Sequence, residues 1–399
     1  MMPVCGRRKV SGMAKARELP HVLLVYQELI PSVRLCGHSQ MEALAAMERI
    51  AYRHCAERQL TQEALRWADI VLLGRVDDSF SCRVAARLRM AGKYLIYILD
   101  DDLFHIPEGI TSAKHYWQPS VQHNIREIIG LSHAILSPSP LLLEKYAVDG
   151  RIGLLTREPT VAPVPYAPHD PAAPVRIGFA GSVDRAADVR ELLGEALAEI
   201  KRVYGEKVQI EFFGFKNPLS ETLNATARPY CSSYDDYRAS LNEAAWDIGL
   251  APMPDTPFHA CKHYNKFVEY AAAGIVGVFS DVEPYAQLKR DIGLGLFCEN
   301  RTEAWIAAIR ELIDDREKLE VMRRQVCECA VTTVSAETIA LALEERMAEI
   351  WPWRAPKNEK AYPLLGWKLL MRVERVGLAI KVYRWKIFSR ALDKLRGRG

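Results

Sequence analysis

The stretch Arg157-Glu-Pro-Thr-Val-Ala-Pro-Val-Pro-Tyr-Ala-Pro-His-Asp-Pro-Ala-Ala-Pro174 divides this sequence into two parts. Six of its eighteen residues are proline. Because proline cannot continue a helix or donate a hydrogen bond within a central strand, we interpret residues 157–174 as a linker between domains. The 399 residues of the chain also exceed the size of one ordinary core. We therefore expect two domains, over residues 20–156 and 175–335, after a flexible segment 1–19.

Before the linker, short apolar runs alternate with segments of helical periodicity. Continuous apolar strands separated by helices indicate a parallel sheet that is covered on both faces. The predicted strands are 21–25, 69–73, 94–99 and 134–136, and the predicted helices are 41–58 and 80–91.

The same alternation starts again after the linker. The predicted strands are 175–179, 208–213, 247–251, 277–280 and 294–297, and the predicted helices are 188–203, 234–244, 262–273 and 302–314. The fold class is therefore α/β, with two Rossmann-like doubly wound domains that face a cleft. Ligands of such sheets bind beyond the carboxyl ends of the strands. The residues expected to face the cleft from the second domain are Gly181, Ser182, Gly214, Pro252 and Ser280.

Charge is distributed unevenly along the chain. The net charge is +3, but residues 361–399 hold ten Lys/Arg and two Asp/Glu, which leaves −5 for residues 1–360. A mildly acidic body argues against a nucleic-acid partner and assigns the basic character to the C-terminal segment.

The nine cysteines are scattered and form no Cys-x-x-Cys pair. An odd count without such pairs argues against a disulfide framework and against a structural zinc site, so we expect a reducing cytoplasm. The first residues lack the apolar stretch of a secretory signal, and no run of eighteen apolar residues occurs.

The segment Lys262-His-Tyr-Asn-Lys266-Phe-Val-Glu269 is the strongest candidate for chemistry. Lys262, Lys266 and Glu269 have the spacing i, i+4, i+7, which predicts one shared helical face. Two ammonium groups near a helix N-terminus suit a diphosphate, and a carboxylate two turns along can accept both hydroxyls of a ribose. Gly274 can end this helix in the left-handed conformation. The alternative interpretation is a solvated Lys–Glu surface helix.

The aspartates Asp100-Asp101-Asp102 follow an apolar strand at the end that faces the cleft. One hypothesis is a carboxylate cluster that orients substrate or binds a metal, as in the Asp-x-Asp site of single-domain GT-A transferases. We rank the metal site lower because that class lacks a second Rossmann half. The alternative is helix capping and turn formation.

Residues 258–285 resemble the donor-site helix of GT-B glycosyltransferases, namely glycosyltransferase family 4 and related bacterial glycan and O-antigen-type enzymes. They are similar to the subgroup pattern Lys-Ser-x-x-Lys-x-x-Glu-Tyr, which is followed by a strand and a Tyr-bearing turn. Residues 177–182, 69–75 and 97–107 resemble other parts of the same enzymes, so the likeness covers roughly residues 20–350.

The resemblance implies transfer of a sugar from a nucleotide-sugar donor to a glycan or lipid-linked acceptor, with retention and without an obligatory metal or cofactor. The leaving diphosphate would be stabilised by Lys262 and Lys266, and we add Asp100 and Asp101 as catalytic candidates. The donor-binding candidates are Gly181, Ser182, Phe213, Gly214, Pro252, Phe258, Lys262, His263, Lys266 and Glu269. The resemblance also implies that a last helix, 336–353, crosses back onto the first domain.

The chain departs from the family pattern at three positions. The first glutamate of the family's usual pair would fall at Cys261, His263 replaces a serine, and Val276 replaces a common proline. A non-catalytic nucleotide-binding protein that scaffolds glycan assembly, and a nucleotide-sugar epimerase on the same fold, therefore stay open as alternatives.

The basic tail, residues 354–399, contains a further pattern. Its apolar residues recur at helical spacing, Lys and Arg lie mainly off that stripe, and Trp367 and Trp385 add interfacial aromatics. This pattern is typical of an amphipathic helix on an anionic membrane surface. We therefore expect a cytoplasmic protein that is peripheral on the inner face of the membrane. The alternatives are a helix packed against the body and a partner-binding helix.

Overall fold

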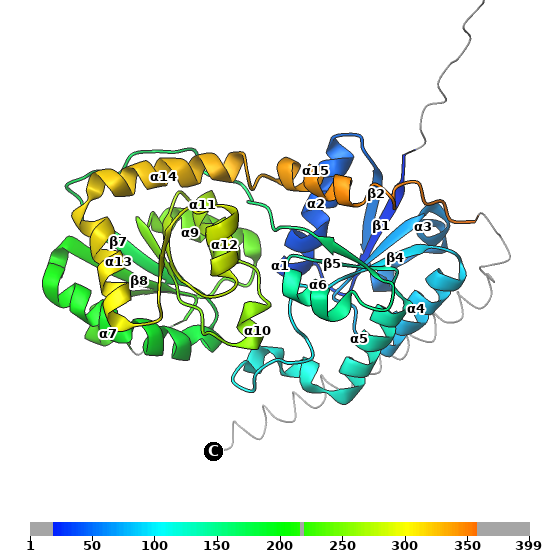
Figure 1. Cartoon of the computed structure of the whole chain (residues 1–399), viewed down its shortest axis with the longest axis horizontal. Helices are drawn as coiled ribbons and strands as arrows, with labels where there is room; N and C mark the ends of the chain where they lie inside the picture. Colours follow the sequence, from blue (N-terminus) through cyan, green and yellow to red (C-terminus); the bar gives the residue numbers. More distant parts are fainter. Residues whose placement is uncertain (1–18, 216–218, 357–399) are drawn as a thin grey trace, which may run out of the picture.

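The computed structural model describes residues 19–215 and 219–356. Two parallel six-stranded sheets form the cores of two parts, here called the first half and the second half (Figure 1). The strands of the first half are β1 (His21–Tyr26), β2 (Ala51–Ala56), β3 (Ile70–Gly74), β4 (Tyr94–Ile98), β5 (Ala134–Ser137) and β6 (Ile152–Leu155). Those of the second half are β7 (Val175–Ala180), β8 (Val208–Phe213), β9 (Thr226–Arg228), β10 (Ile248–Ala251), β11 (Val276–Ser280) and β12 (Leu296–Cys298).

Strand order identifies both sheets as doubly wound. The first has the order β2-β1-β3-β4-β5-β6 and the second β12-β11-β10-β7-β8-β9. The direction of winding reverses between β1 and β3 and between β7 and β10. Ligands of doubly wound sheets bind beside such switch points, at the carboxyl ends of the strands. The α/β class and the pair of Rossmann-like units predicted from the sequence are confirmed.

Helices cover both sheets. In the first half they are α1 (Pro31–Val33), the π-helix η1 (Arg34–His38), α2 (Ser39–Ala46), η2 (Glu57–Gln59), α3 (Gln62–Trp67), α4 (Ser79–Met90), η3 (Thr111–Trp117), α5 (Pro119–Leu131) and α6 (Pro140–Tyr146). In the second half they are η4 (Val183–Arg185), α7 (Ala186–Tyr204), η5 (Gly205–Lys207), α8 (Leu219–Thr222), α9 (Tyr234–Ala244), α10 (Pro257–Ala260), α11 (Asn265–Ala272), α12 (Tyr285–Asp291), α13 (Thr302–Asp314) and α14 (Arg316–Val331). The helix α15 (Ala336–Arg346) follows.

The apolar runs of the sequence form the central strands. Every residue of β3, β4, β10 and β11 is buried. A strand that is covered on both faces needs apolar side chains on both, which explains why the sequence signal is continuous there.

One predicted helix is wrong in its second part. The helix expected over 41–58 ends at Ala46, and β2 begins at Ala51. Glu48, with φ 57°, lies in the turn between them. β2 is an edge strand whose side chains are only partly buried or exposed, so it lacks the apolar run that marks an interior strand. The strands β6 and β9, which the sequence did not predict, are edge strands too.

The helix expected over 336–353 is shorter than predicted. α15 ends at Arg346, and turns follow as far as Pro352. In Figure 1, α14 runs along the second half and α15 (orange) lies on the first half beside α2. Leu343 and Met347 are buried in the core between α2 and the first sheet. The amphipathic part of the predicted tail, residues 361–399, lies outside the described residues.

The proline-rich segment lies along the second half. The Thr160 amide donates to the carbonyl of Val334 at 2.9 Å, and the Val164 amide donates to that of Ala272 at 2.8 Å. Val334 belongs to the short connection between α14 and α15, where the chain returns to the first half. The two chain segments that connect the halves are therefore hydrogen-bonded to each other.

No single helix in the described ranges has both the length and the apolar content to cross a membrane. Only α14 and α15 taken as a pair, with a bend of 51° between them, pass that test.

Candidate functional site

Two cavities open beyond the carboxyl ends of the strands. The central cavity, of about 620 Å³, lies between the halves and is lined by residues of both, including Arg75 and Asp100 of the first and Arg185 and His259 of the second. The side cavity, of about 360 Å³, lies mainly on the second half. The residues that line both are Ile30, Ser182, Lys266 and Glu269. The two spaces therefore adjoin at the switch point of the second sheet.

The turns after β7 and β8 form the wall of the side cavity. The Gly181 amide donates to the Phe213 carbonyl at 3.0 Å. Gly214 has φ +104°, and a Cβ atom there would lie 2.1 Å from the Gly181 carbonyl oxygen. Only glycine permits this close approach of two backbones. Phe213 packs on Tyr237, with ring centroids 5.2 Å apart, and both line the cavity.

Lys266 and Glu269 lie on α11 at the border of the two cavities. Lys266 Nζ is 2.6 Å from Glu269 Oε2, and the Tyr237 hydroxyl donates to the same oxygen at 2.8 Å. Arg238 donates to the Glu269 main-chain carbonyl at 2.7 Å. These contacts fix a carboxylate and an ammonium group side by side, next to the turn that carries Ser182.

Lys262 is placed differently from the prediction. The helix α11 begins at Asn265, so Lys262 lies in the bend after α10 and does not share a helical face with Lys266. Tyr264, which precedes the helix, has φ −81° and ψ 48°, which is not helical. Lys262 nevertheless lines the central cavity, where its Nζ is 2.7 Å from Asp101 Oδ1. It also lies 4.6 Å from the ring centroid of Phe258, another predicted site residue.

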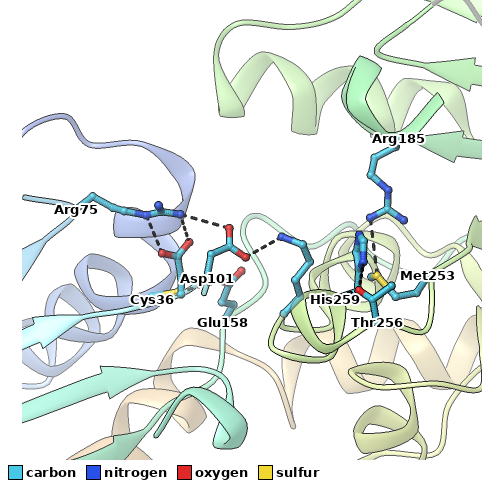
Figure 2. Close-up of polar contacts among 10 residues, drawn as sticks. Cys36, Arg75, Asp101, Glu158, Arg185, Met253, Thr256 and His259 are labelled. Atoms are coloured by element: carbon cyan, nitrogen blue, oxygen red, sulfur yellow. Dashed lines mark hydrogen bonds and ion pairs between the residues drawn. The ribbon is translucent and has the colours of Figure 1, made fainter. Parts of the chain in front are cut away.

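The three aspartates after β4 have separate surroundings. Arg75 holds Asp100 with two contacts, from Nε at 2.8 Å and from Nη2 at 2.9 Å. It also lies 3.5 Å from Asp101 (Figure 2). Burial acts to raise the pKa of Asp101, but the nearby charges of Lys262 and Arg75 lower it below the usual value. Asp100 and Asp101 line the central cavity.

Asp102 faces the first half. It is fully buried and accepts hydrogen bonds from Lys145 Nζ at 3.0 Å and from the Tyr146 hydroxyl at 2.6 Å. Its carboxylate thus anchors α6. Of the aspartate triplet, two members face the cavity and the third has a structural role.

Two predicted positions lie away from both cavities. The Pro252 carbonyl accepts a hydrogen bond from Arg185 at 2.7 Å, and Ser280 is fully buried beneath Met253 and Asn300. Pro252 therefore acts on the site through Arg185, which does line the central cavity.

The segment between α10 and α11 carries two further positions singled out in the sequence. His263 lines the central cavity, and its burial lowers the pKa to about 4, so the ring is neutral at pH 7. Cys261 is 1% exposed and packs into the core of the first half, where Lys145 Nζ lies 3.3 Å from its Sγ. The Cys261 side chain, which stands where the resembled enzymes have a glutamate, therefore lines neither cavity.

Sequence reasoning missed two residues that the structure brings into the site. Tyr237 on α9 holds Glu269, and Glu158, from the proline-rich segment, is buried in the wall of the central cavity. Neither carries a local signal: Tyr237 follows ordinary helical spacing, and Glu158 precedes a proline in a segment interpreted as a linker. In the described part of the chain, no group of three or more His, Cys, Asp or Glu residues could hold a metal ion.

No protein-family model matches the chain, and no curated protein matches it in sequence. Solved structures do match. A glycosyltransferase from Rickettsia africae is 12% identical with a TM-score of 0.56, over 84% of this chain and 100% of that one. Anabaena HepE, in complex with UDP and glucose, is 13% identical with a TM-score of 0.53, over 82% and 99%.

A third match has a different activity in its name. A Listeria monocytogenes protein named as a UDP-N-acetylglucosamine 2-epimerase is 12% identical with a TM-score of 0.50, over 82% of this chain and 97% of that one. At these identities the likeness concerns the fold. The two doubly wound sheets, the cavities at their switch points and these matches together show that the chain has the GT-B fold.

Proposed function

We propose that this protein is a glycosyltransferase that moves a sugar from a nucleotide-sugar donor to a glycan or lipid-linked acceptor. The observation that carries the proposal is the position of Lys266 and Glu269. They form a 2.6 Å ion pair at the border of two adjoining cavities, at the switch point of the second sheet. One cavity is of a size for a nucleoside, and the larger one has room for a sugar and an acceptor.

Each cavity has the chemistry that its part of the donor requires. Phe213, Tyr234 and Tyr237 line the side cavity and supply aromatic surface for a base. Glu269 accepts the ribose hydroxyls, while Lys266 and the backbone near Ser182 face the diphosphate.

The central cavity then receives the sugar and the acceptor. Lys262 and Arg185 line it with positive charge, which stabilises a leaving diphosphate as the bond to the sugar breaks. We further propose retention at the anomeric carbon and no obligatory metal, as the resemblance to family 4 implies. In this mechanism the enzyme accelerates the reaction by holding the donor and the acceptor close together in one cleft.

Two other functions use the same cavities. An epimerase is favoured by the likeness to the Listeria protein. A non-catalytic nucleotide-binding scaffold is favoured by Cys261, which stands where the resembled enzymes have a glutamate and packs into the core of the first half. All three functions require a bound nucleotide, so binding alone does not separate them.

A panel of UDP-, GDP-, ADP- and dTDP-sugars, incubated with the full chain, separates these functions. Release of the nucleoside diphosphate, or transfer to an added acceptor, supports the transferase. Interconversion of two nucleotide sugars supports the epimerase, and saturable binding without turnover supports the scaffold. Glu269→Gln is the matched control in each assay, since an activity of this site weakens in that variant. A chain that binds no member of the panel contradicts the proposal.

A further inference from the structure

Glu158 is a carboxyl group that the proposed mechanism has not yet used. It follows β6 by three residues, at the start of the proline-rich segment. It is 2% exposed and lines the central cavity. Figure 2 shows it beside Cys36 and Asp101, on the side of the cavity formed by the first half. A buried ionisable group in the wall of a ligand cavity is a candidate for contact with the ligand.

The two oxygens of this carboxyl group have different partners. The Cys36 thiol donates to Oε1 at 3.0 Å. Oε2 is buried and has no partner at hydrogen-bonding geometry among the described residues. The side chain of Asn265 lies near enough to lower the pKa of Glu158 slightly, without meeting that geometry. One oxygen is thus held in place, and the other is left to bond a ligand or to carry a proton.

The surroundings of Glu158 favour its protonated form. Burial is the largest cause, and the carboxylates of Asp100 and Glu269 add to it; together they raise the pKa of Glu158 to about 8. The other titratable neighbours, Cys36 and Tyr234, also have pKa values raised by burial. Arg75 is a cation that acts on the neighbouring Cys36, and it is held by Asp100 and Asp101.

We propose that Glu158 is a substrate-contacting residue that keeps its proton at neutral pH and donates a hydrogen bond from Oε2 to a diphosphate oxygen of the bound nucleotide sugar. This proposal rests on the proposed function. An ionised Glu158 would place a third negative charge beside Asp100 and Glu269, where it would repel the diphosphate and could only accept hydrogen bonds. The proton stays on the carboxyl group, so no covalent bond forms or breaks at this residue.

The first test is the pH dependence of nucleotide binding. The probe is whichever of UDP, GDP, ADP and dTDP binds the wild-type chain most tightly, titrated calorimetrically at pH 6.5 and 9.5. We expect the wild-type Kd to rise roughly tenfold between these values as Glu158 ionises. Glu158→Gln keeps a neutral donor, so its Kd should match wild type at pH 6.5 and change less than about twofold at pH 9.5.

Glu57 provides a matched control. It is a buried glutamate whose pKa is also raised by burial, to about 7, but it binds Ser81 and lines neither cavity. Glu57→Gln should therefore show the wild-type loss of affinity at pH 9.5. The same loss in Glu158→Gln, or failure of that variant to bind at pH 6.5, overturns the proposal.

The second test needs no nucleotide. The folded-state pKa of Glu158 is about 8 and its ordinary value is 4.5, so the folded protein holds a proton that the unfolded chain has lost between these pH values. The stability from this group is present at low pH and is lost as pH rises to about 8. Between pH 5 and 8.5 the melting temperature of the wild-type protein should fall relative to that of Glu158→Gln. Above pH 8.5 the difference between the two melting temperatures should stay constant.

The two tests separate the two proposals. A chain that binds none of the four diphosphates refutes the proposed function and the ligand contact, whereas its melting curves still report whether Glu158 is protonated. A melting-temperature difference that does not change with pH overturns the inference even if nucleotide binds. The difference in melting temperature between wild type and Glu57→Gln should also change with pH, because Glu57 is another buried glutamate with a raised pKa. This control shows that the measurement detects a buried protonated glutamate.

Discussion

Lys262 Nζ lies 2.7 Å from Asp101 Oδ1, and this ion pair joins the second half to the first across the central cavity. The cation that suits a bound diphosphate is therefore paired with Asp101. A nucleotide that binds must compete with Asp101 for Lys262.

Asp101→Asn should tighten nucleotide binding, because Lys262 is then free to contact the diphosphate. Both side chains are about one quarter exposed, so we expect a modest gain of about 1 kcal/mol, or roughly fivefold in Kd. Calorimetric titration measures it. Asp281→Asn, which removes the Lys289–Asp281 pair outside both cavities, is the control and should have no effect. Weaker binding by Asp101→Asn would show that Asp101 contacts the donor instead.

Glu269→Gln should weaken nucleotide binding roughly tenfold, about 1.4 kcal/mol, because it replaces one of the two accepting oxygens by a donating NH2 group, so the two ribose hydroxyls no longer each have an oxygen of their own. The loss should be smaller for a 2′-deoxy nucleotide, which lacks one of these hydroxyls, and this comparison isolates the contact. Tyr237→Phe removes only the hydroxyl that orients Glu269 and should cost less. An equal loss with both nucleotides would assign Glu269 to positioning Lys266.

Asp100→Asn should lower the stability of the protein. Asp100 and Arg75 are each about nine-tenths buried, so removal of the carboxylate leaves a buried guanidinium with Asp101 at 3.5 Å and the ring of Tyr116 as its neighbours. Breaking a buried pair costs about 3 kcal/mol in such a setting. Denaturant unfolding measures the change, and the double variant Asp100→Asn/Arg75→Met should recover part of it. Unchanged stability with lost turnover would instead identify Asp100 as a catalytic residue.

Gly214→Ala should disrupt the turn of the side cavity. The new Cβ atom would lie 2.1 Å from the Gly181 carbonyl oxygen, so the two turns must separate. We expect a loss of about 2 kcal/mol or more in stability and weaker nucleotide binding. Gly205→Ala is the matched control: its φ is also positive, at +55°, but no atom lies within 4 Å of its added Cβ. Similar losses in both variants would trace the effect to backbone conformation alone.

Deletion of residues 361–399 tests the expected membrane contact of the basic tail. This segment carries a charge of +8, which attracts an anionic surface. The deletion should move the protein from the membrane fraction to the soluble fraction and abolish binding to vesicles that contain phosphatidylglycerol. Unchanged fractionation would leave the tail as a helix packed on the body or bound to a partner.

Much of the fold could be predicted because interior strands carry a strong signal. β3, β4, β10 and β11 are buried on both faces, and each appears in the sequence as an unbroken apolar run. The strands that escaped prediction lie at sheet edges, where neighbours on one side are absent and polar side chains are tolerated. The end of a helix could also be predicted where the backbone requires glycine, as at Gly274, whose φ is +68°.

The candidate site could be predicted only in part. Lys266, Glu269 and the Gly181–Ser182 turn lie together because each follows a strand of one sheet, which the order of elements indicates. The start of α11 was misplaced by three residues, since the residue before the helix is Tyr264, which is not a typical N-cap residue and makes no capping hydrogen bond with its side chain. The place of Glu158 depends on how the halves meet, and that information is not local in sequence.

The hydrogen bond between Thr160 and Val334 has a mechanical consequence. Two separate, flexible connections would let the halves slide and twist independently. Two connections that are hydrogen-bonded to each other form one hinge. We therefore expect the halves to open and close by rotation about that hinge axis. Glu158 lies two residues from that bond, close to the axis, where an angular movement displaces atoms least. The exposed contact between Ser112 and Asp184 also joins the halves, so an opening movement would have to break it.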